Sequence, residues 1–151
     1  MNNKNKRRSW SLFFLQAFLG IGALCGGASL VIDPSGALIG MPLSMIEGSP
    51  FPNYLVPGVI LFCVLGVIPI IISSGLIRQW HWELAGKFNL FQDKHWSWAF
   101  SLYSGFALVI WITIQVYIIN AFSTVHFIYM MLGLVIQAVT LLPKIQEKYR
   151  V

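Results

Sequence analysis

Charged residues are scarce in this chain of 151 residues: they make up 10% of it, and only five are Asp or Glu. Hydrophobic residues make up 57%. This composition excludes a soluble globular protein, because such proteins carry about 25% charged residues on their surfaces. It predicts an all-α membrane protein in contact with the lipid bilayer.

Motifs that carry chemistry are absent. The two cysteines, Cys25 and Cys63, do not form the C-x-x-C pattern of thiol oxidoreductases, so we interpret them as small packing residues. No Gly-rich phosphate loop, H-E-x-x-H or G-x-S-x-G occurs. The histidines and acids of the middle loop match no metal-ligand spacing. We therefore expect no catalytic residue, no metal and no cofactor, and a protein that is not an enzyme.

Four long apolar stretches cover most of the chain, at about 10–32, 55–77, 97–119 and 124–142. Each has the length of roughly 20 residues that a bilayer-spanning helix needs. They predict a single domain over residues 1–151, folded as an antiparallel bundle of four transmembrane helices. None of them carries Asp, Glu, Lys or Arg in its middle, which argues against an ion-coupled pump or a proton relay.

The basic residues all lie on one side of this four-helix pattern. Because Lys and Arg concentrate in cytoplasmic loops, the pattern predicts that both termini and the middle loop are cytoplasmic. Anionic lipid headgroups are their expected counterions, and we expect no nucleic acid as partner, since no soluble domain is left to bind it. The ten residues are Lys4, Lys6, Arg7, Arg8, Arg78, Lys87, Lys94, Lys144, Lys148 and Arg150.

Small residues line the first predicted helix: Ala17, Gly20, Ala23 and Gly27 recur three or four positions apart. This spacing allows two helix backbones to approach closely. We interpret it as packing within the chain; the alternative is contact with a membrane protein partner or a second copy of the chain. In the second helix, Pro69 predicts a kink or a loosened turn.

The segment between the first and second helices contains five of the seven prolines and forms the predicted outer loop. Residues 33–36, Asp-Pro-Ser-Gly, fit a type I turn. Residues 37–46 are too apolar for open water and too short to span a bilayer. They predict a segment that lies in the outer interface or re-enters the bundle, and the sequence leaves both open.

Four short runs of this loop lie within residues 32–58: 32–36 (IDPSG), 40–44 (GMPLS), 48–52 (GSPFP) and 57–58 (PG). They resemble a segment of small, uncharacterised bacterial integral membrane proteins with four helices. The resemblance implies a location in the bacterial cytoplasmic (inner) membrane. It implies no activity and no functional residues.

Polar residues gather near the outer ends of the third and fourth helices, beneath this loop. Glu47 in the loop, Gln115 and His126 form the candidate ligand-binding site, because histidine and a carboxylate can bind a polar ligand or exchange a proton. The leading hypothesis is a structural or accessory component of a membrane assembly. The alternative is a channel- or carrier-like protein that binds a small solute or lipid under the outer loop. The third hypothesis is a membrane enzyme acting on lipid or quinone.

Overall fold

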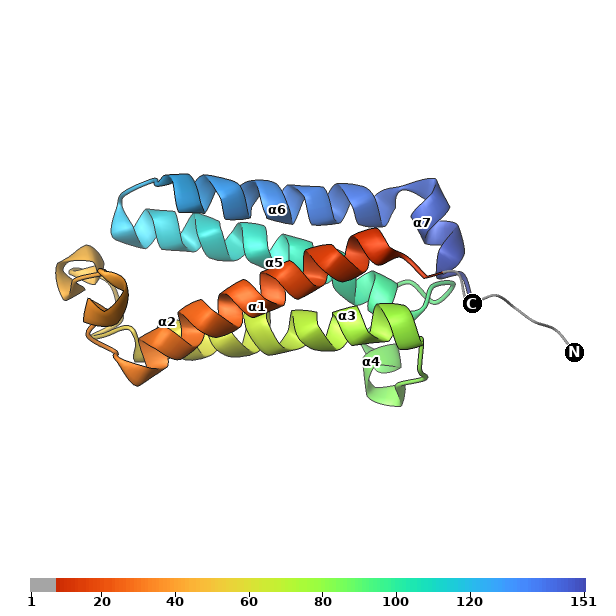
Figure 1. Cartoon of the computed structure of the whole chain (residues 1–151), viewed down its shortest axis with the longest axis horizontal. Helices are drawn as coiled ribbons and strands as arrows, with labels where there is room; N and C mark the ends of the chain where they lie inside the picture. The colour runs from red at the N-terminus through yellow and green to blue at the C-terminus, as the bar shows by residue number, and fades with distance from the viewer. Residues whose placement is uncertain (1–7) are drawn as a thin grey trace, which may run out of the picture.

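Four long helices run along one axis in the computed structural model, which describes residues 8–151 (Figure 1). All four are long and apolar enough to span a membrane, and the described residues contain no strand. The prediction of an all-helical chain with four such helices is confirmed. Their ends lie within one residue of the ranges expected from sequence: α1 (Trp10–Ile32), the second span (Leu55–Arg78), α5 (Trp96–Ile119) and α6 (Thr124–Leu141).

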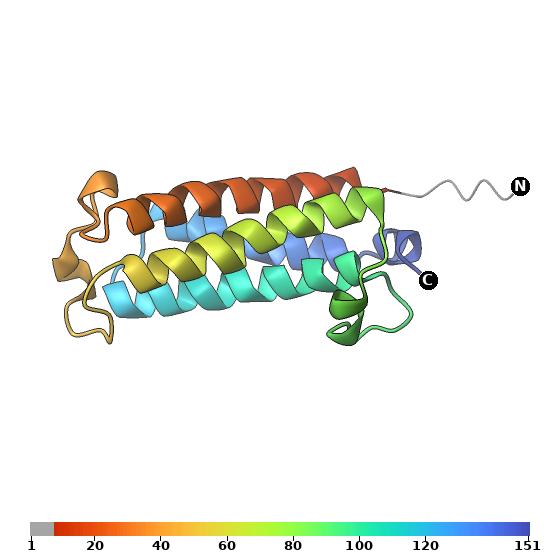
Figure 2. The ribbon, with the colours of Figure 1, turned by 90° about the horizontal axis from the view of Figure 1, so that it is seen from below.

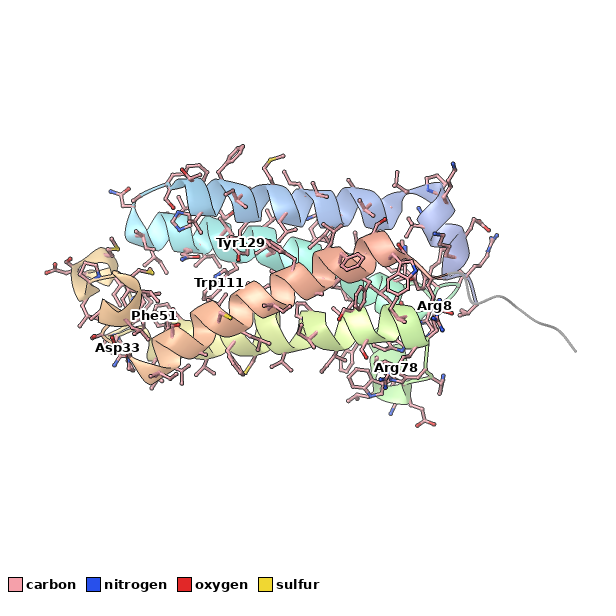
Figure 3. All side chains as sticks on the ribbon, in the orientation of Figure 1. Arg8, Asp33, Phe51, Arg78, Trp111 and Tyr129 are labelled. Carbon is pink, nitrogen blue, oxygen red and sulfur yellow. The ribbon has the colours of Figure 1, made fainter. Side chains whose placement is uncertain are left out.

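Short elements cap both ends of the bundle. At one end, which we call the loop end, residues 33–54 form two 3-10 turns, η1 (Ala37–Ile39) and η2 (Leu43–Ile46). At the other, the basic end, lie α4 (Glu83–Lys87) and α7 (Pro143–Lys148) (Figure 2). The basic residues from Arg8 onward lie at the basic end, where Figure 3 labels Arg8 and Arg78. Lys4, Lys6 and Arg7 lie outside the described residues.

The outer loop lies beyond the end of α1 (Figure 1). Gly36 N–H donates to the Asp33 carbonyl at 3.0 Å, which confirms the predicted turn. Tyr54 fastens the loop, because its N–H donates to the Pro34 carbonyl at 2.9 Å and its hydroxyl to the Pro42 carbonyl at 3.2 Å. Residues 37–46 therefore form a roof over the end of the bundle and do not re-enter between the helices.

The second span changes its helical geometry in its middle. It comprises α2 (Leu55–Ile60), a π-helical stretch η3 (Leu61–Val67) and α3 (Ile68–Arg78). In η3 the hydrogen bonds reach one residue further than in an α-helix: the N–H of Ile68 bonds to the Cys63 carbonyl. Pro69, which has no N–H to donate, follows directly. The loosening predicted at Pro69 thus appears as a wide turn before it, and the helix continues to Arg78.

Small residues bring α1 and the second span into close contact. A methyl group added at Gly20 would lie 3.1 Å from the Gly66 carbonyl oxygen, and one added at Gly27 would lie 2.6 Å from the Phe62 nitrogen. From the other side, Gly58 meets Leu30 in the same way. The small residues of the first helix therefore pack within the chain.

Hydrogen bonds join α1 to α5, and α5 to α6, in the basic half of the bundle. Gln16 of α1 is fully buried and donates to Ser104 Oγ of α5 at 2.7 Å. The indole N–H of Trp98 in α5 donates to the Thr140 carbonyl of α6 at 2.8 Å. Such bonds hold helices together where no water is available.

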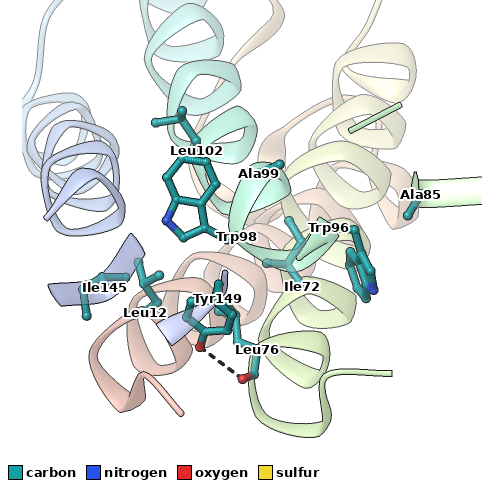
Figure 4. Packing of buried hydrophobic residues seen from close by; sticks show 10 residues of the cluster. All are labelled: Leu12, Ile72, Leu76, Ala85, Trp96, Trp98, Ala99, Leu102, Ile145 and Tyr149. Carbon is teal, nitrogen blue, oxygen red and sulfur yellow. Dashed lines mark hydrogen bonds between the residues drawn. The ribbon is translucent and has the colours of Figure 1, made fainter. Parts of the chain in front are cut away.

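The C-terminal segment closes the basic end. The Tyr149 hydroxyl donates to the Leu76 carbonyl at 3.1 Å (Figure 4) and accepts the Ser9 N–H at 3.0 Å. Burial raises the pKa of Tyr149 to about 12, so the phenol stays protonated and keeps both bonds at neutral pH. Further along, the His95 N–H donates to the Tyr149 carbonyl at 2.7 Å. One buried side chain thus connects the start of α1, the end of α3 and the chain terminus.

The glycine packing of α1 generates a prediction with a neighbouring control. We expect Gly27→Ala to lower the stability of the bundle by about 1–3 kcal/mol, because the added carbon meets the Phe62 backbone, which cannot rotate away. At Gly26 the nearest atom is the end of Leu61, at 3.5 Å, so Gly26→Ala should leave stability unchanged or raise it. Thermal unfolding in a mild detergent measures both variants. Equal effects at the two positions would contradict the close approach.

Candidate ligand-binding cavity

A cavity of about 460 Å³ lies at the loop end of the bundle. Helices α1, η3, α5 and α6 form its walls, and the outer loop forms its roof. Most of the lining is apolar: it includes Leu19, Ala23, Leu61, Leu65, Leu108, Trp111 and Ile112 from the helices, and Ile39, Met41 and Met45 from the loop. Its size falls in the range of small-molecule sites, about 300–1,000 Å³.

Toward the loop end, α1 stays packed against the second span and diverges from α5 and α6 (Figure 1). The cavity lies in the space that this divergence leaves. Tyr129 of α6 bridges part of the resulting space: its ring stacks on Phe18 of α1 at 6.4 Å between centroids, and its hydroxyl lies directly over Gly22. Figure 3 shows Trp111 and Tyr129 in this region, next to α1. A larger residue at position 22 would displace the Tyr129 hydroxyl.

Three polar side chains in the lining have donor groups without partners. Within residues 8–151, the Gln115 amide and the Tyr129 hydroxyl make no hydrogen bond. His126 uses only Nδ1, which accepts the Ser123 N–H at 3.1 Å in a capping box that begins α6. A neutral imidazole that accepts at Nδ1 carries its hydrogen on Nε2. The His126 Nε2–H is therefore a donor without a protein partner at the cavity wall.

The lining contains no charged residue. At the loop end the charged side chains are two carboxylates, and Asp33 is engaged in its own turn. There it accepts the Ser35 hydroxyl and the Leu38 N–H at 2.8 Å. These hydrogen bonds, the Ser35 hydroxyl first, hold the pKa of Asp33 below its ordinary value. The electrostatic character of the cavity is that of neutral hydrogen-bonding groups in an apolar wall.

Glu47 lies apart from the other two sequence-predicted residues. Gln115 and His126 line the cavity, whereas Glu47 lines a separate open hollow of the loop surface, with Leu43, Ser44, Phe51 and Pro52 among its neighbours. The prediction that the three residues share one site is corrected for Glu47. The path of the loop explains why Glu47 is separate: the η2 turn brings Met45 into the cavity lining and leaves Glu47 outside it.

Sequence reasoning missed Trp111 as a cavity residue. A signal was present, because five of the six tryptophans cluster near the basic end of the helices and Trp111 is the exception. At a membrane boundary, Trp is explained by its amphipathic ring. A Trp away from both boundaries needs another reason, which here is the cavity wall.

Apolar side chains close the cavity toward the basic end. Leu19, Leu65 and Leu108 line its floor and are almost completely buried. Ile112 and Ile136 belong to the same cluster. Below this floor lies the Gln16–Ser104 hydrogen bond, so the cavity does not continue into the basic half as a polar path.

His95 and Trp96, at the end of the middle loop, have structural partners, whereas the buried Nε2 of Gln79 at its start has none among the described residues. The His95 ring caps α5, because its Nδ1 accepts the Ser97 N–H at 3.3 Å, and its Nε2 lies 3.0 Å from the Trp80 carbonyl. The Trp96 indole N–H donates to that same carbonyl at 2.8 Å. Among the described residues, no three His, Cys, Asp or Glu side chains gather into a candidate metal site.

No family model, curated protein or solved structure matches this chain in the comparisons. The resemblance of the outer loop to a bacterial membrane protein family therefore stays an expectation.

The contact between Gly22 and Tyr129 can be tested with a double-mutant cycle. We expect Gly22→Ala to destabilise the protein, because the added carbon displaces the Tyr129 hydroxyl and disturbs its stack on Phe18. In a Tyr129→Phe background the displaced oxygen is absent, and the same substitution should be neutral. The expected coupling is about 0.5–2 kcal/mol, from thermal unfolding of the four proteins. Identical effects of Gly22→Ala in both backgrounds would contradict the contact.

Proposed function

We propose that this chain is a non-catalytic, multi-pass membrane protein that binds a lipid-like molecule in the loop-end cavity. The observation that carries the proposal is an apolar cavity of about 460 Å³ with unpartnered polar groups in its wall. Gln115 and Tyr129 are half-buried and His126 is buried, and a donor group of each lacks a partner within residues 8–151. A ligand with an apolar body and a small polar part would fill the cavity and pair with these groups.

The floor of the cavity favours binding over passage across the membrane. A channel needs a continuous polar or wet path, and here buried leucines separate the cavity from the hydrogen-bonded half of the bundle. The lining contains no Cys, Asp or Glu, and the Nδ1 atom of its His126 is engaged with Ser123 in the cap that begins α6. Cys25 and Cys63 are exposed on the outside of the helices.

A structural or accessory role is the second candidate. The small residues of α1 are occupied by the second span, so a partner contact through them would compete with the packing within the chain. The outer loop offers a different surface, because Leu38, Leu43 and Met45 are exposed there. A membrane partner or a second copy of the chain docking on these side chains would give the loop a role that does not need the cavity.

Filling the cavity separates the two candidates. Gly26 faces the cavity with room beside it, so Gly26→Phe should occupy the space without touching a backbone. We expect the parent protein, purified from its membrane in mild detergent, to retain a lipid-like molecule that Gly26→Phe loses. Ile21→Phe, on the exposed face of the same helix, is the matched control and should retain it. Mass spectrometry of the bound molecules is the measurement.

The same purification can contradict the proposal. If parent and Gly26→Phe carry identical lipids, and both retain a protein partner at a constant ratio to the chain, the accessory role replaces the binding role. In that case the outer loop is the surface to mutate.

We propose that the protein lies in the bacterial cytoplasmic membrane with its basic end in the cytoplasm. The support is the asymmetry of charge: Arg8 and Arg78 lie at one end, together with α7, which carries Lys144 and Lys148 (Figures 1 and 3). The bacterial origin comes from the loop resemblance.

Single cysteines test this orientation. In a Cys25→Ser, Cys63→Ser background, Ser49→Cys places a thiol in the outer loop and Val151→Cys places one at the basic end. A membrane-impermeant maleimide added to intact bacteria should label Ser49→Cys and leave Val151→Cys unlabelled until the cells are opened. The reverse pattern would invert the proposed orientation.

A further inference from the structure

The polar groups of the cavity lie at one depth in the bundle. Gln115 lies one turn before the end of α5, and His126 and Tyr129 lie in the first two turns of α6. Because α5 and α6 pack side by side and are joined by a short connection, these positions lie at similar distances from the loop end. The apolar wall of Leu19, Leu65 and Leu108 lies deeper. A bound molecule would place its polar end near the loop and its apolar body toward the floor.

Charge excludes a phosphate at this polar end. Between Ser9 and Ile77 there is no Lys or Arg, and none occurs between His95 and Pro143. The loop-end charges are both negative, and neither lies in the cavity lining. An anionic headgroup would be buried without a counterion, at an end of the bundle whose only charged side chains within residues 8–151 are carboxylates, which is strongly unfavourable. The ligand's polar end is therefore uncharged.

The hydrogen-bond donors in the cavity lining further define the polar end of the ligand. With Nδ1 occupied by the Ser123 N–H, His126 presents only a donor, Nε2–H, to the cavity. The Gln115 amide adds two N–H groups and the Tyr129 hydroxyl one O–H. A pure hydrocarbon would leave all of these unpaired. A ligand with carbonyl oxygens can accept from His126 and from Gln115 or Tyr129.

The rim of the cavity is apolar. Ile39, Met45 and Val125 line the cavity and are also exposed at the surface of the bundle. A molecule that enters between them passes through hydrocarbon contacts, which favours entry from the membrane over entry from water.

We propose that the cavity selects an uncharged lipid whose polar end carries carbonyl oxygens, with His126 Nε2–H, Gln115 and Tyr129 as the groups that recognise it. Two lipid sources share this chemistry, acylglycerols and prenylated quinones. The inference rests on the proposed function and adds to it the class of headgroup.

Four probes of similar length test the selectivity of the purified full-length protein: dioleoylglycerol, a prenylated naphthoquinone, dioleoylphosphatidylglycerol and squalene. We expect dioleoylglycerol or the quinone to bind at least about 10-fold more tightly than the phospholipid and the hydrocarbon, the equivalent of one hydrogen bond to a desolvated group. Native mass spectrometry with titration of each probe gives the affinities. The carbonyl lipid that binds more tightly shows whether the ligand is an acylglycerol or a prenylated quinone.

Variants assign the selectivity to the named groups. His126→Glu keeps the cap of α6, because Glu at this position of a capping box also accepts the Ser123 N–H, and its carboxylate offers no donor to the cavity. We expect His126→Glu and Gln115→Met each to weaken binding of the carbonyl lipid about 10-fold, and Gln115→Met to leave binding of squalene unchanged. Tyr129→Phe provides a third variant if either of these does not fold. Tyr117→Phe, an exposed tyrosine of α5, is the control and should bind as the parent does.

The outcomes separate the two levels of the proposal. Equal affinity for all four probes, lost in Gly26→Phe, would overturn the selectivity and leave lipid binding intact. Tightest binding of the phospholipid would also overturn it. If no probe binds in a manner sensitive to Gly26→Phe, both the selectivity and the proposed function fail.

Discussion

The close approach of α1 to the second span is the constraint on which the rest of the structure depends. Gly20 and Gly27 on one side and Gly58 and Gly66 on the other let the two backbones approach closely along the loop-end half of α1. In a membrane this contact is stabilised by van der Waals packing, since lipid offers no hydrophobic drive for helices to associate. Because α1 is packed so closely against the second span, it cannot also stay in contact with α5 and α6, which diverge from it toward the loop end. The cavity between α1, α5 and α6 results from that geometry.

Two glutamines show how differently the two halves of the bundle treat a polar side chain. Gln16 is fully buried and hydrogen-bonded to Ser104, and with the Tyr149 hydroxyl it belongs to a basic end whose polar groups hold helices together. Gln115 lines a cavity and makes no hydrogen bond within residues 8–151. Gln79, which follows α3 at the basic end, is an exception there, because its buried Nε2 has no hydrogen-bond partner among the described residues. The unbonded Gln115 in the cavity wall supports the binding site that we propose at the loop end.

The sequence was sufficient for the helices and insufficient for the site. Long apolar runs mark all four long helices clearly, and depth along the helices placed Gln115 and His126 at one level, where both line the cavity. Glu47 could not be placed, because its position depends on tertiary bonds of the loop, such as that from Tyr54 to the Pro42 carbonyl. The cavity itself has no sequence pattern: it is the space left by the divergence of α1, which only the packing of all four helices determines.

The outer loop, which is rich in proline, covers a cavity that has few polar groups in its wall. Gly36 and Gly40 adopt positive φ angles of 77° and 68°, which turn the chain so that Ile39, Met41 and Met45 cover the cavity. These side chains reduce the access of water to His126 and Gln115. Under an apolar roof each hydrogen bond forms in a low dielectric and an unmatched group is costly. In the site that we propose, three neutral donor groups would then distinguish a carbonyl lipid from a hydrocarbon, and the roof would contribute to this selectivity as much as the polar residues do.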